Sequence, residues 1–189
     1  RDFYPQFKKK GLVIDVRHNR GGNIDSFILE KLMREAFFYW KSRTGEPYWN
    51  MNYAFRGHLV LLVDEFTASD GEAFAEGFRR LGLGKAIGAR TWGGEVWLSG
   101  VNTLSDNGIA RAPMNGVYGE TENGTEWLIE GVGFIPDIEV INLPKATFEG
   151  KDAQLDAAIE HLKELIQKDP RPIPTPPAYP DLSFKNGKN

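Results

Sequence analysis

The strongest constraint on the fold is an apolar run that leads through a short turn into a helical pattern. The run from His58 to Val63 is rich in leucine and valine, which predicts a buried strand, and Phe74 and Phe78 lie one helical turn apart in the segment from Gly71 to Leu81. Ser69 lies in the turn. An N-cap serine is common before a helix, but a hydroxyl here could also act as a nucleophile, because the N–H groups that begin the helix can stabilise an oxyanion. This stretch alone leaves both interpretations open.

Two further segments repeat the alternation of strand and helix. Gly11 to Val16 predicts a strand buried on both faces, and a mostly buried helix is expected from Ile24 to Phe37 with Asn23 as its N-cap. Lys85 to Ala89 predicts a third short strand. Strands that alternate with helices in this way indicate an α/β fold with right-handed crossovers and a parallel sheet.

The second half of the chain is expected to be β-rich and to end in one helix. Asp152 is the expected N-cap of that helix, which runs to Ile166, and a Pro-rich tail follows Lys168. The expected domains are therefore a core over residues 1–168 and an extended tail over 169–189, with a linker or clamp role. The long aromatic segment from Phe38 to Arg56 is expected to be a loop that covers a site or packs on the core. The short strands expected in the second half are Val101 to Leu104, Ile109 to Ala112, Gly116 to Tyr118, Trp127 to Val132 and Ile138 to Ile141.

Composition narrows the classes of partner. The chain has 189 residues and a net charge of -3, so no electrostatic argument favours nucleic acid or an anionic membrane. No apolar segment approaches the roughly 20 residues that span a bilayer. There is no Cys and only three scattered His, so neither a catalytic metal nor another cofactor is expected. The compartment stays open, because chains without cysteine occur on both sides of a membrane.

Three loops are expected to meet where the parallel strands end, which is where α/β proteins place their sites. The loop with Gly21 and Gly22 can present backbone N–H groups, and the Ser69 turn can present a hydroxyl at a helix N-terminus. The loop with Trp92, Gly93 and Gly94 can offer an edge to an extended peptide. This combination suits acyl transfer.

The sequence offers no convincing general base for such a serine. His161 is expected on a solvated helix face, His58 opens a strand, and His18 near the glycine loop is as well explained by a structural hydrogen bond. Glu130 lies beside two glycines in an apolar segment. An acid there is either solvated at a strand edge or buried and paired for a purpose.

Five motifs in order resemble the C-terminal catalytic domain of tricorn-type serine proteases, in the group that also holds the C-terminal processing proteases. The resemblance covers roughly residues 11–166 and implies a spiral of ββα units like that of the crotonase and Clp protease superfamily. The motifs are Asp15-Val-Arg-His-Asn-Arg-Gly-Gly22, Thr67-Ala-Ser-Asp-Gly71, Leu81-Gly-Leu-Gly-Lys-Ala-Ile-Gly88, Thr91-Trp-Gly-Gly94 and Gly150-Lys-Asp-Ala-Gln-Leu-Asp156.

The resemblance implies a role for each matched residue. Ser69 matches the nucleophile, and the N–H groups of Gly22 and Asp70 match the oxyanion hole. Glu130 matches the acid that orients the catalytic histidine through a second serine. The processing proteases use a lysine base, which is absent here because the matching stretch is Trp92-Gly93-Gly94-Glu95. This favours the tricorn branch, whose histidine and serine lie upstream, before a PDZ-like insertion, so the chain is expected to be the C-terminal part of a longer enzyme.

The expected function is therefore that of a serine endopeptidase or oligopeptidase that acts on peptides or unfolded proteins and forms a homo-oligomer. Gly21, Trp92, Gly93 and Gly94 are expected to bind the substrate. One alternative is a non-catalytic module on the same fold that binds an apolar ligand, such as a retinoid or lipid, or a peptide. CoA-thioester chemistry on a crotonase-like fold is a weaker alternative.

Overall fold

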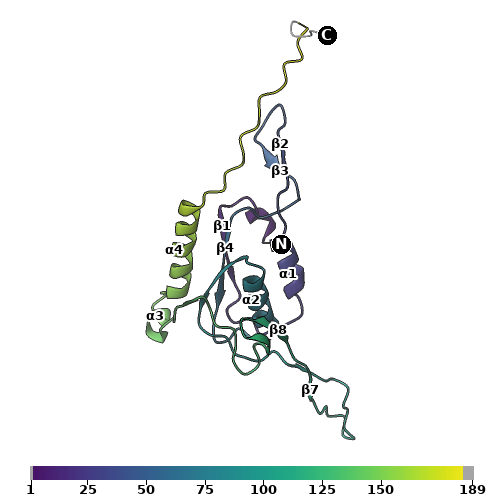
Figure 1. Cartoon of the computed structure of the whole chain (residues 1–189). Helices are drawn as coiled ribbons and strands as arrows, with labels where there is room; N and C mark the ends of the chain where they lie inside the picture. Colours follow the sequence, from purple (N-terminus) through teal and green to yellow (C-terminus); the bar gives the residue numbers. More distant parts are fainter. Residues whose placement is uncertain (1, 185–189) are drawn as a thin grey trace.

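The computed structural model describes residues 2–184 and has a parallel four-stranded sheet at its centre (Figure 1). The strands are β1 (Gly11–Asp15), β4 (His58–Val63), β5 (Gly84–Gly88) and β10 (Ile138–Glu139), in the order β1-β4-β5-β10. Every residue of β4 is buried, because this strand has a neighbour on each edge and helices on both faces. The predicted parallel strands are confirmed, but β1 is only partly buried rather than buried on both faces, because it lies at an edge of the sheet.

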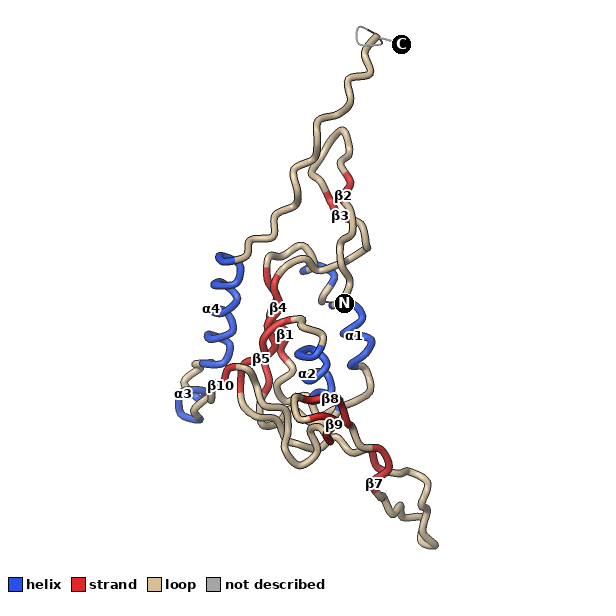
Figure 2. Tube along the Cα trace, in the orientation of Figure 1, coloured by secondary structure: helices blue, strands red, loops and turns tan. Residues whose placement is uncertain are grey.

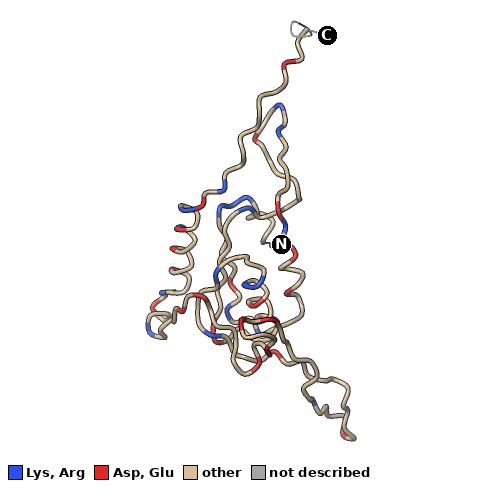
Figure 3. Tube along the Cα trace, viewed as in Figure 1, with Lys and Arg blue, Asp and Glu red and all other residues tan. Residues whose placement is uncertain are grey.

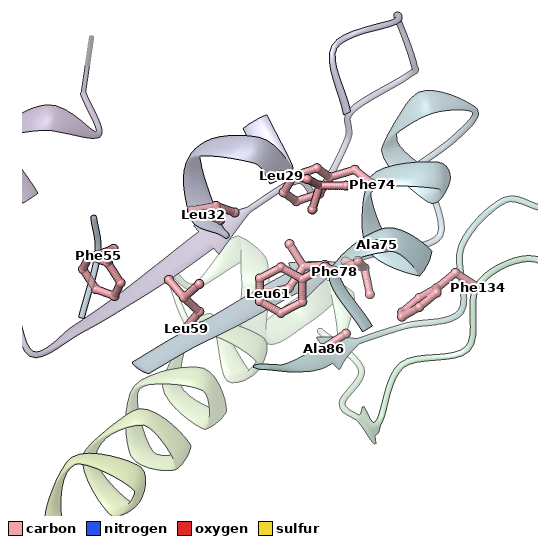
Figure 4. Packing of buried hydrophobic residues seen from close by; sticks show 11 residues of the cluster. Leu29, Leu32, Phe55, Leu59, Leu61, Phe74, Ala75, Phe78, Ala86 and Phe134 are labelled. Carbon is pink, nitrogen blue, oxygen red and sulfur yellow. The ribbon is translucent and has the colours of Figure 1, made fainter. Parts of the chain in front are cut away.

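Helices cover both faces of the sheet (Figure 2). α1 (Asp25–Leu32) and α2 (Asp70–Arg80) lie on one face and α4 (Ala153–Lys168) lies on the other. The side chains of β4 alternate accordingly. Leu61 and Val63 belong to the larger core, in which Phe74 and Phe78 of α2 are buried (Figure 4), whereas Val60 and Leu62 face α4. Burial of each such side chain contributes about 1.5–3 kcal/mol.

Two helices agree with the patterns that predict them. α2 begins directly after Ser69, and Phe74 and Phe78 are buried as expected. In α4, Asp152 is the N-cap, and its carboxylate accepts a hydrogen bond of 3.0 Å from the Leu155 N–H. A hydrogen bond to Arg17 holds the pKa of Asp152 well below its usual range.

The first helix was predicted too long and too deeply buried. α1 ends at Leu32, its N-cap is Ile24 rather than Asn23, and only Leu29 and Leu32 are buried. The reason is that α1 packs through one narrow face against α2. Leu29 lies so close to Gly77 that a Cβ there would be 2.7 Å from the Leu29 Cδ1. The other apolar residues of the predicted stripe, including Phe27 and Phe37, are exposed.

The second half is less regular than predicted. Its strands are β6 (Trp97–Leu98), β7 (Pro113–Asn115), β8 (Tyr118–Thr121) and β9 (Gly124–Trp127), and α3 (Pro144–Phe148) follows β10. The segments expected as strands at 101–104 and 109–112 form only an isolated bridge between Thr103 and Ile109. They lie in an arm whose residues are almost all exposed, so no sheet surface is available for them to extend.

The aromatic segment contains a two-stranded hairpin, β2 (Tyr39–Trp40) and β3 (Tyr48–Trp49), near the short 3-10 helix η1 (Tyr4–Gln6). Trp49 packs edge-on against Phe7 beside the beginning of β4, so the hairpin lies at the end of the sheet opposite Ser69 and does not cover that turn. The extended tail runs along it, and the Tyr179 hydroxyl donates to the Ser42 carbonyl at 3.1 Å. Residues 185–189 of the expected tail lie outside the described residues. Within residues 2–184, no helix is both long and apolar enough to cross a membrane.

Candidate active site

Ser69 occupies a constrained turn between β4 and α2. Its backbone has φ 53° and ψ -127°, a conformation that costs a non-glycine residue about 1–3 kcal/mol and that is common at functional sites. Ser69 is the residue before the first turn of α2, and its N–H donates to the Glu72 carboxylate at 3.0 Å. The serine is therefore at the N-cap position, in a strained conformation that an ordinary cap does not require.

The glycine loop packs directly on this turn. The Ala68 N–H donates to the Asn19 carbonyl at 2.8 Å, and the Asp70 carboxylate accepts from the Ile24 N–H at 2.9 Å. Gly21 has φ 108°, and a Cβ on it would lie 2.7 Å from the Cβ of Ser69. A larger residue at this position would displace the serine, so the close approach requires glycine.

The two residues predicted to supply the N–H groups of an oxyanion hole are both close to Ser69. Asp70 begins α2, so its N–H has no acceptor within the helix. Gly22 follows Gly21 with φ 153°, and a Cβ on it would lie 3.6 Å from the Asp70 carboxylate. Neither N–H donates to another described residue, so both are free to bind an incoming oxygen.

Glu72 connects the serine turn to the third loop. The side chain is fully buried and accepts four hydrogen bonds: from the Ser69 N–H, the Thr91 hydroxyl, the Gly93 N–H at 2.7 Å and the Gly94 N–H at 3.0 Å. Sequence reasoning missed this residue. The spacing of a Ser followed three positions later by a Glu is the capping-box pattern, which could have indicated the bond to Ser69 but not the bonds to the distant loop.

Glu130 lies on the same cleft as Ser69. Its Oε2 accepts from the N–H groups of Glu95 and Val96, each at 2.8 Å, although the side chain remains exposed. Glu130 is therefore solvated rather than buried, although one of its oxygens is paired with two backbone N–H groups. The cleft has a volume of about 790 Å³ and is lined by Gly22, Asn23, Ser69, Trp92, Gly94, Val96, Trp97, Leu98, Arg111, Pro113 and Glu130.

All of the predicted site residues are thus close to this cleft. Gly21 contacts Ser69, Asp70 follows it in the chain, and Gly93 lies between two residues that line the cleft. Among the described residues, no group of His, Cys, Asp and Glu side chains could hold a metal ion.

None of the three histidines lines the cleft. The ring of His18 stacks on Phe66, and its Nε2 lies 3.3 Å from the Asp64 carboxylate. The buried His58 ring is hydrogen-bonded to the Asp169 carbonyl at 2.8 Å. The expectation of a solvated His161 is wrong, because its Nε2 is buried and has no partner within residues 2–184. This ring lies on the partly buried part of α4.

Glu95 is a second acid that sequence reasoning did not single out. Only 4% of the residue is exposed, and burial, reinforced by the negative charge of Glu72, raises the pKa of Glu95 to about 7. It follows Gly94 directly, so it is held beside the serine turn by the hydrogen bonds that Gly93 and Gly94 donate to Glu72. The polar environment of residue 95 arises from contacts distant in sequence, which no local pattern reveals.

Comparison with known proteins identifies the family. The model of peptidase family S41 matches residues 1–140. The chain is 34% identical over 180 residues to the tricorn protease of Thermoplasma acidophilum, covering 94% of this chain and 16% of that protein. It is 37% identical over 166 residues to the tricorn protease homolog of Saccharolobus solfataricus, covering 87% and 15%. A crystal structure of the tricorn protease matches with a TM-score of 0.76 at 35% identity, covering 84% of this chain and 15% of that one.

The chain therefore spans about a sixth of the length of these relatives. The family match extends over most of the chain and includes the glycine loop, the Ser69 turn and the loop that carries Glu95. The resemblance to tricorn-type proteases that the sequence motifs indicate is confirmed, and the chain belongs to peptidase family S41.

Proposed function

We propose that the chain carries the nucleophile, the oxyanion hole and the orienting acid of a serine endopeptidase or oligopeptidase that acts on peptides or unfolded proteins. Ser69 attacks the carbonyl of the substrate and forms an acyl-enzyme, which water then hydrolyses. The N–H groups of Gly22 and Asp70 stabilise the oxyanion. The substrate chain lies extended along Trp92, Gly93 and Gly94.

The observation that carries this proposal is the convergence of three distant loops on Ser69. A nucleophile needs donors near the position where the oxyanion forms. Gly22 lines the same cleft as Ser69 and Asp70 follows Ser69, and the N–H groups of both have no acceptor within residues 2–184. The strained backbone of Ser69 and the close approach of Gly21 support the same role. An ordinary helix cap explains neither feature.

The proposal includes a base from outside residues 1–189. The three histidines of the chain do not line the cleft, and the chain spans about a sixth of its relatives, which leaves room for a histidine and its serine partner in an upstream domain. Glu130 orients that histidine through the serine. Its Oε2 is held by two N–H groups, and its exposed side chain can accept a further bond.

The test compares Ser69→Ala with the wild type in the natural polypeptide that contains residues 1–189. We expect Ser69→Ala to lower kcat for a fluorogenic peptide by several orders of magnitude. Ser26→Ala is the matched control, because Ser26 is exposed on α1 and its hydroxyl is hydrogen-bonded only to the Asp25 carboxylate. Near-normal hydrolysis by Ser69→Ala would exclude the proposed nucleophile.

A second experiment tests the origin of the base. Residues 1–189 alone should hydrolyse the same peptide very slowly, and steady turnover by them would show that a base exists within the chain. A fluorophosphonate that reacts with Ser69 only in the longer polypeptide would support an upstream histidine. A preparation that carries a bound lipid and whose Ser69 never reacts would instead favour the binding module.

The proposed architecture and partners follow from the same family relationship. We infer a crotonase-like spiral of ββα units from that relationship, and the parallel strand order β1-β4-β5-β10 with helices on both faces is compatible with it. Upstream PDZ-like and histidine-bearing domains would belong to the same polypeptide. A homo-oligomer is supported by exposed aromatic side chains on the β2–β3 hairpin, such as Trp40 and Tyr48. Light scattering at several concentrations tests the oligomer.

A further inference from the structure

A basic hollow lies at the end of the sheet opposite Ser69. Its volume of about 320 Å³ falls within the range of small-molecule sites, about 300–1,000 Å³. Three segments form most of its lining: residues 7–10 before β1, residues 56–58 where β4 begins, and residues 169–173 after α4. None of its lining residues lines the cleft of Ser69, so a ligand bound here does not occupy the proposed substrate site.

The lining of the basic hollow carries far more positive than negative charge. The basic side chains are Lys8, Lys9, Lys10, Arg56 and Arg171, and the acid is Asp169. With histidine counted as neutral, this is an excess of four positive charges, although the whole chain has a net charge of -3. Figure 3 shows basic residues along the segment that leads into β1 and beside the end of α4. Such a local concentration of one sign of charge attracts a ligand of the opposite sign.

The single acid does not neutralise the basic hollow. The Asp169 carboxylate accepts from the Arg171 Nε at 2.9 Å and lies 3.6 Å from the His58 Nε2, so it is already engaged. The lysines at positions 8–10 are exposed and have no carboxylate partner within residues 2–184. Three ammonium groups are therefore available to an incoming anion.

The two guanidinium groups of the hollow are held in place by backbone carbonyls. Arg56 donates from Nη2 to the Pro172 carbonyl at 2.9 Å, and its guanidinium lies 5.4 Å from the centre of the Trp49 ring. Arg171 donates from Nη1 to the Gly57 carbonyl at 3.2 Å. A guanidinium has five N–H donors, of which Arg56 uses one and Arg171 two within residues 2–184. Two oriented groups with unused donors distinguish this hollow from a surface of freely solvated lysines.

We propose that the basic hollow binds a small polyphosphate, a compound with two or three linked phosphate groups. A terminal phosphate carries about -1.5 to -2 charges at pH 7. Two or three linked phosphates therefore match an excess of four positive charges, which a single carboxylate does not. Guanidinium groups bind phosphate oxygens through two parallel hydrogen bonds, and Arg56 and Arg171 each have donors for them. The small volume suits a compact ligand rather than a nucleic-acid strand.

Such a ligand connects three segments of the chain. Residues 8–10 lead into β1 and Arg171 belongs to the tail, while Gly11 of β1 is paired in register with His58 of β4, so the two strands begin side by side. A polyphosphate that contacts all three segments binds only the folded chain, and the thermal midpoint therefore rises with its concentration. This site does not rest on the proposed peptidase function, so Ser69→Ala should bind polyphosphate as the wild type does.

Titration calorimetry with inorganic triphosphate tests the proposal on the natural polypeptide that contains residues 1–189. The buffer contains about 0.15 M salt, which screens diffuse attraction beyond about 8 Å. We expect saturable binding of one triphosphate per chain, and inorganic monophosphate should bind at least about tenfold more weakly because it contacts fewer cations. Equal affinity for ATP and triphosphate would assign the site to the phosphate chain alone, and tighter binding of ATP to a nucleotide. No saturable binding, equal binding of monophosphate, or tighter binding of a short oligonucleotide would overturn the proposal.

Substitutions locate the site in the basic hollow. Lys9→Gln combined with Lys10→Gln should weaken triphosphate binding at least about fivefold, and both side chains are exposed, so the fold should be retained. Lys145→Gln combined with Lys151→Gln is the matched control, because it removes the same charge near the beginning of α4, whereas the hollow lies at its end. Arg56→Lys keeps the charge but loses the planar fork, and should weaken binding about five- to tenfold. An equal loss in the control pair, or unchanged affinity in either test variant with an unchanged urea midpoint, would overturn the site.

Discussion

Glu72 gives the sharpest test of how the site is held together, because one buried carboxylate accepts four hydrogen bonds from two segments. In Glu72→Gln one oxygen becomes an NH₂ group, which cannot accept. With the amide oxygen kept toward Thr91 and Gly93, the N–H groups of Ser69 and Gly94 lose their acceptor. Each buried donor left unpaired costs about 1–3 kcal/mol, so the free energy of unfolding should fall by about 2–6 kcal/mol.

A loss of this size is a large part of the 5–15 kcal/mol that stabilises a typical domain. Urea denaturation at pH 7.5 measures it as a lower midpoint with an unchanged slope. Glu164→Gln is the control, since its exposed ion pair with Lys168 at 3.5 Å should contribute less than about 1 kcal/mol. A loss below about 1 kcal/mol in Glu72→Gln would refute the claim that this carboxylate joins the two loops.

Three further substitutions test separate parts of the site. The pKa of Glu95 rises from 4.5 to about 7 on folding, so the wild type loses free energy of unfolding as the pH rises from 4.5 to 7. Glu95→Gln does not titrate, and urea denaturation should therefore show its free energy of unfolding gaining about 3 kcal/mol on the wild type between pH 5 and pH 8. Gly21→Ala should lower kcat/KM for a fluorogenic peptide more than tenfold, because its Cβ would meet Ser69, whereas Gly45→Ala, also at positive φ but in open space, should not. Glu130→Gln should lower kcat about a hundredfold or more and leave the urea midpoint nearly unchanged, since one oxygen still accepts from two N–H groups, and an unchanged kcat would exclude the orienting role.

Local patterns predicted the central part of the fold well. β4, α2 and the turn that holds Ser69 follow from an apolar run, a small-residue turn and two phenylalanines at helical spacing, all within one short segment. The parallel sheet also follows from the alternation of strand and helix. These features depend on neighbours in the chain, which is the information that periodicity contains.

The same patterns failed where tertiary contacts decide the structure. Phe27 and Phe37 continue an apolar stripe that predicts a longer buried helix, yet both are exposed, because only Leu29 and Leu32 of α1 are buried against the domain. Apolar spacing cannot say whether a partner covers a helix face. The arm between β6 and β7 is a second example, since its short apolar segments have no sheet to join.

In the candidate site, too, the residues found from sequence motifs differ from those whose environment depends on tertiary contacts. The motif resemblance selected Ser69 and Glu130, and the structure brings both to one cleft. Glu72 and Glu95 were missed as site residues, because their environments depend on loops about 20 residues apart in sequence that meet only in the folded chain. A capping-box spacing could have marked Glu72 as a helix-end residue, but no sequence pattern marks a buried acid that lacks a partner.

The three acids around Ser69 differ in how much of their accepting capacity the fold already uses. A carboxylate offers about four acceptor sites on two oxygens. Glu72 uses all four, which suits a purely structural role, whereas Glu130 uses two, both on Oε2, and keeps Oε1 for a further donor. Glu95 uses none. Glu130 is exposed, so water can occupy its free oxygen until the proposed catalytic partner binds it. Glu95 is buried, and an ionised carboxylate without donors is costly there, which is why burial favours its protonated form.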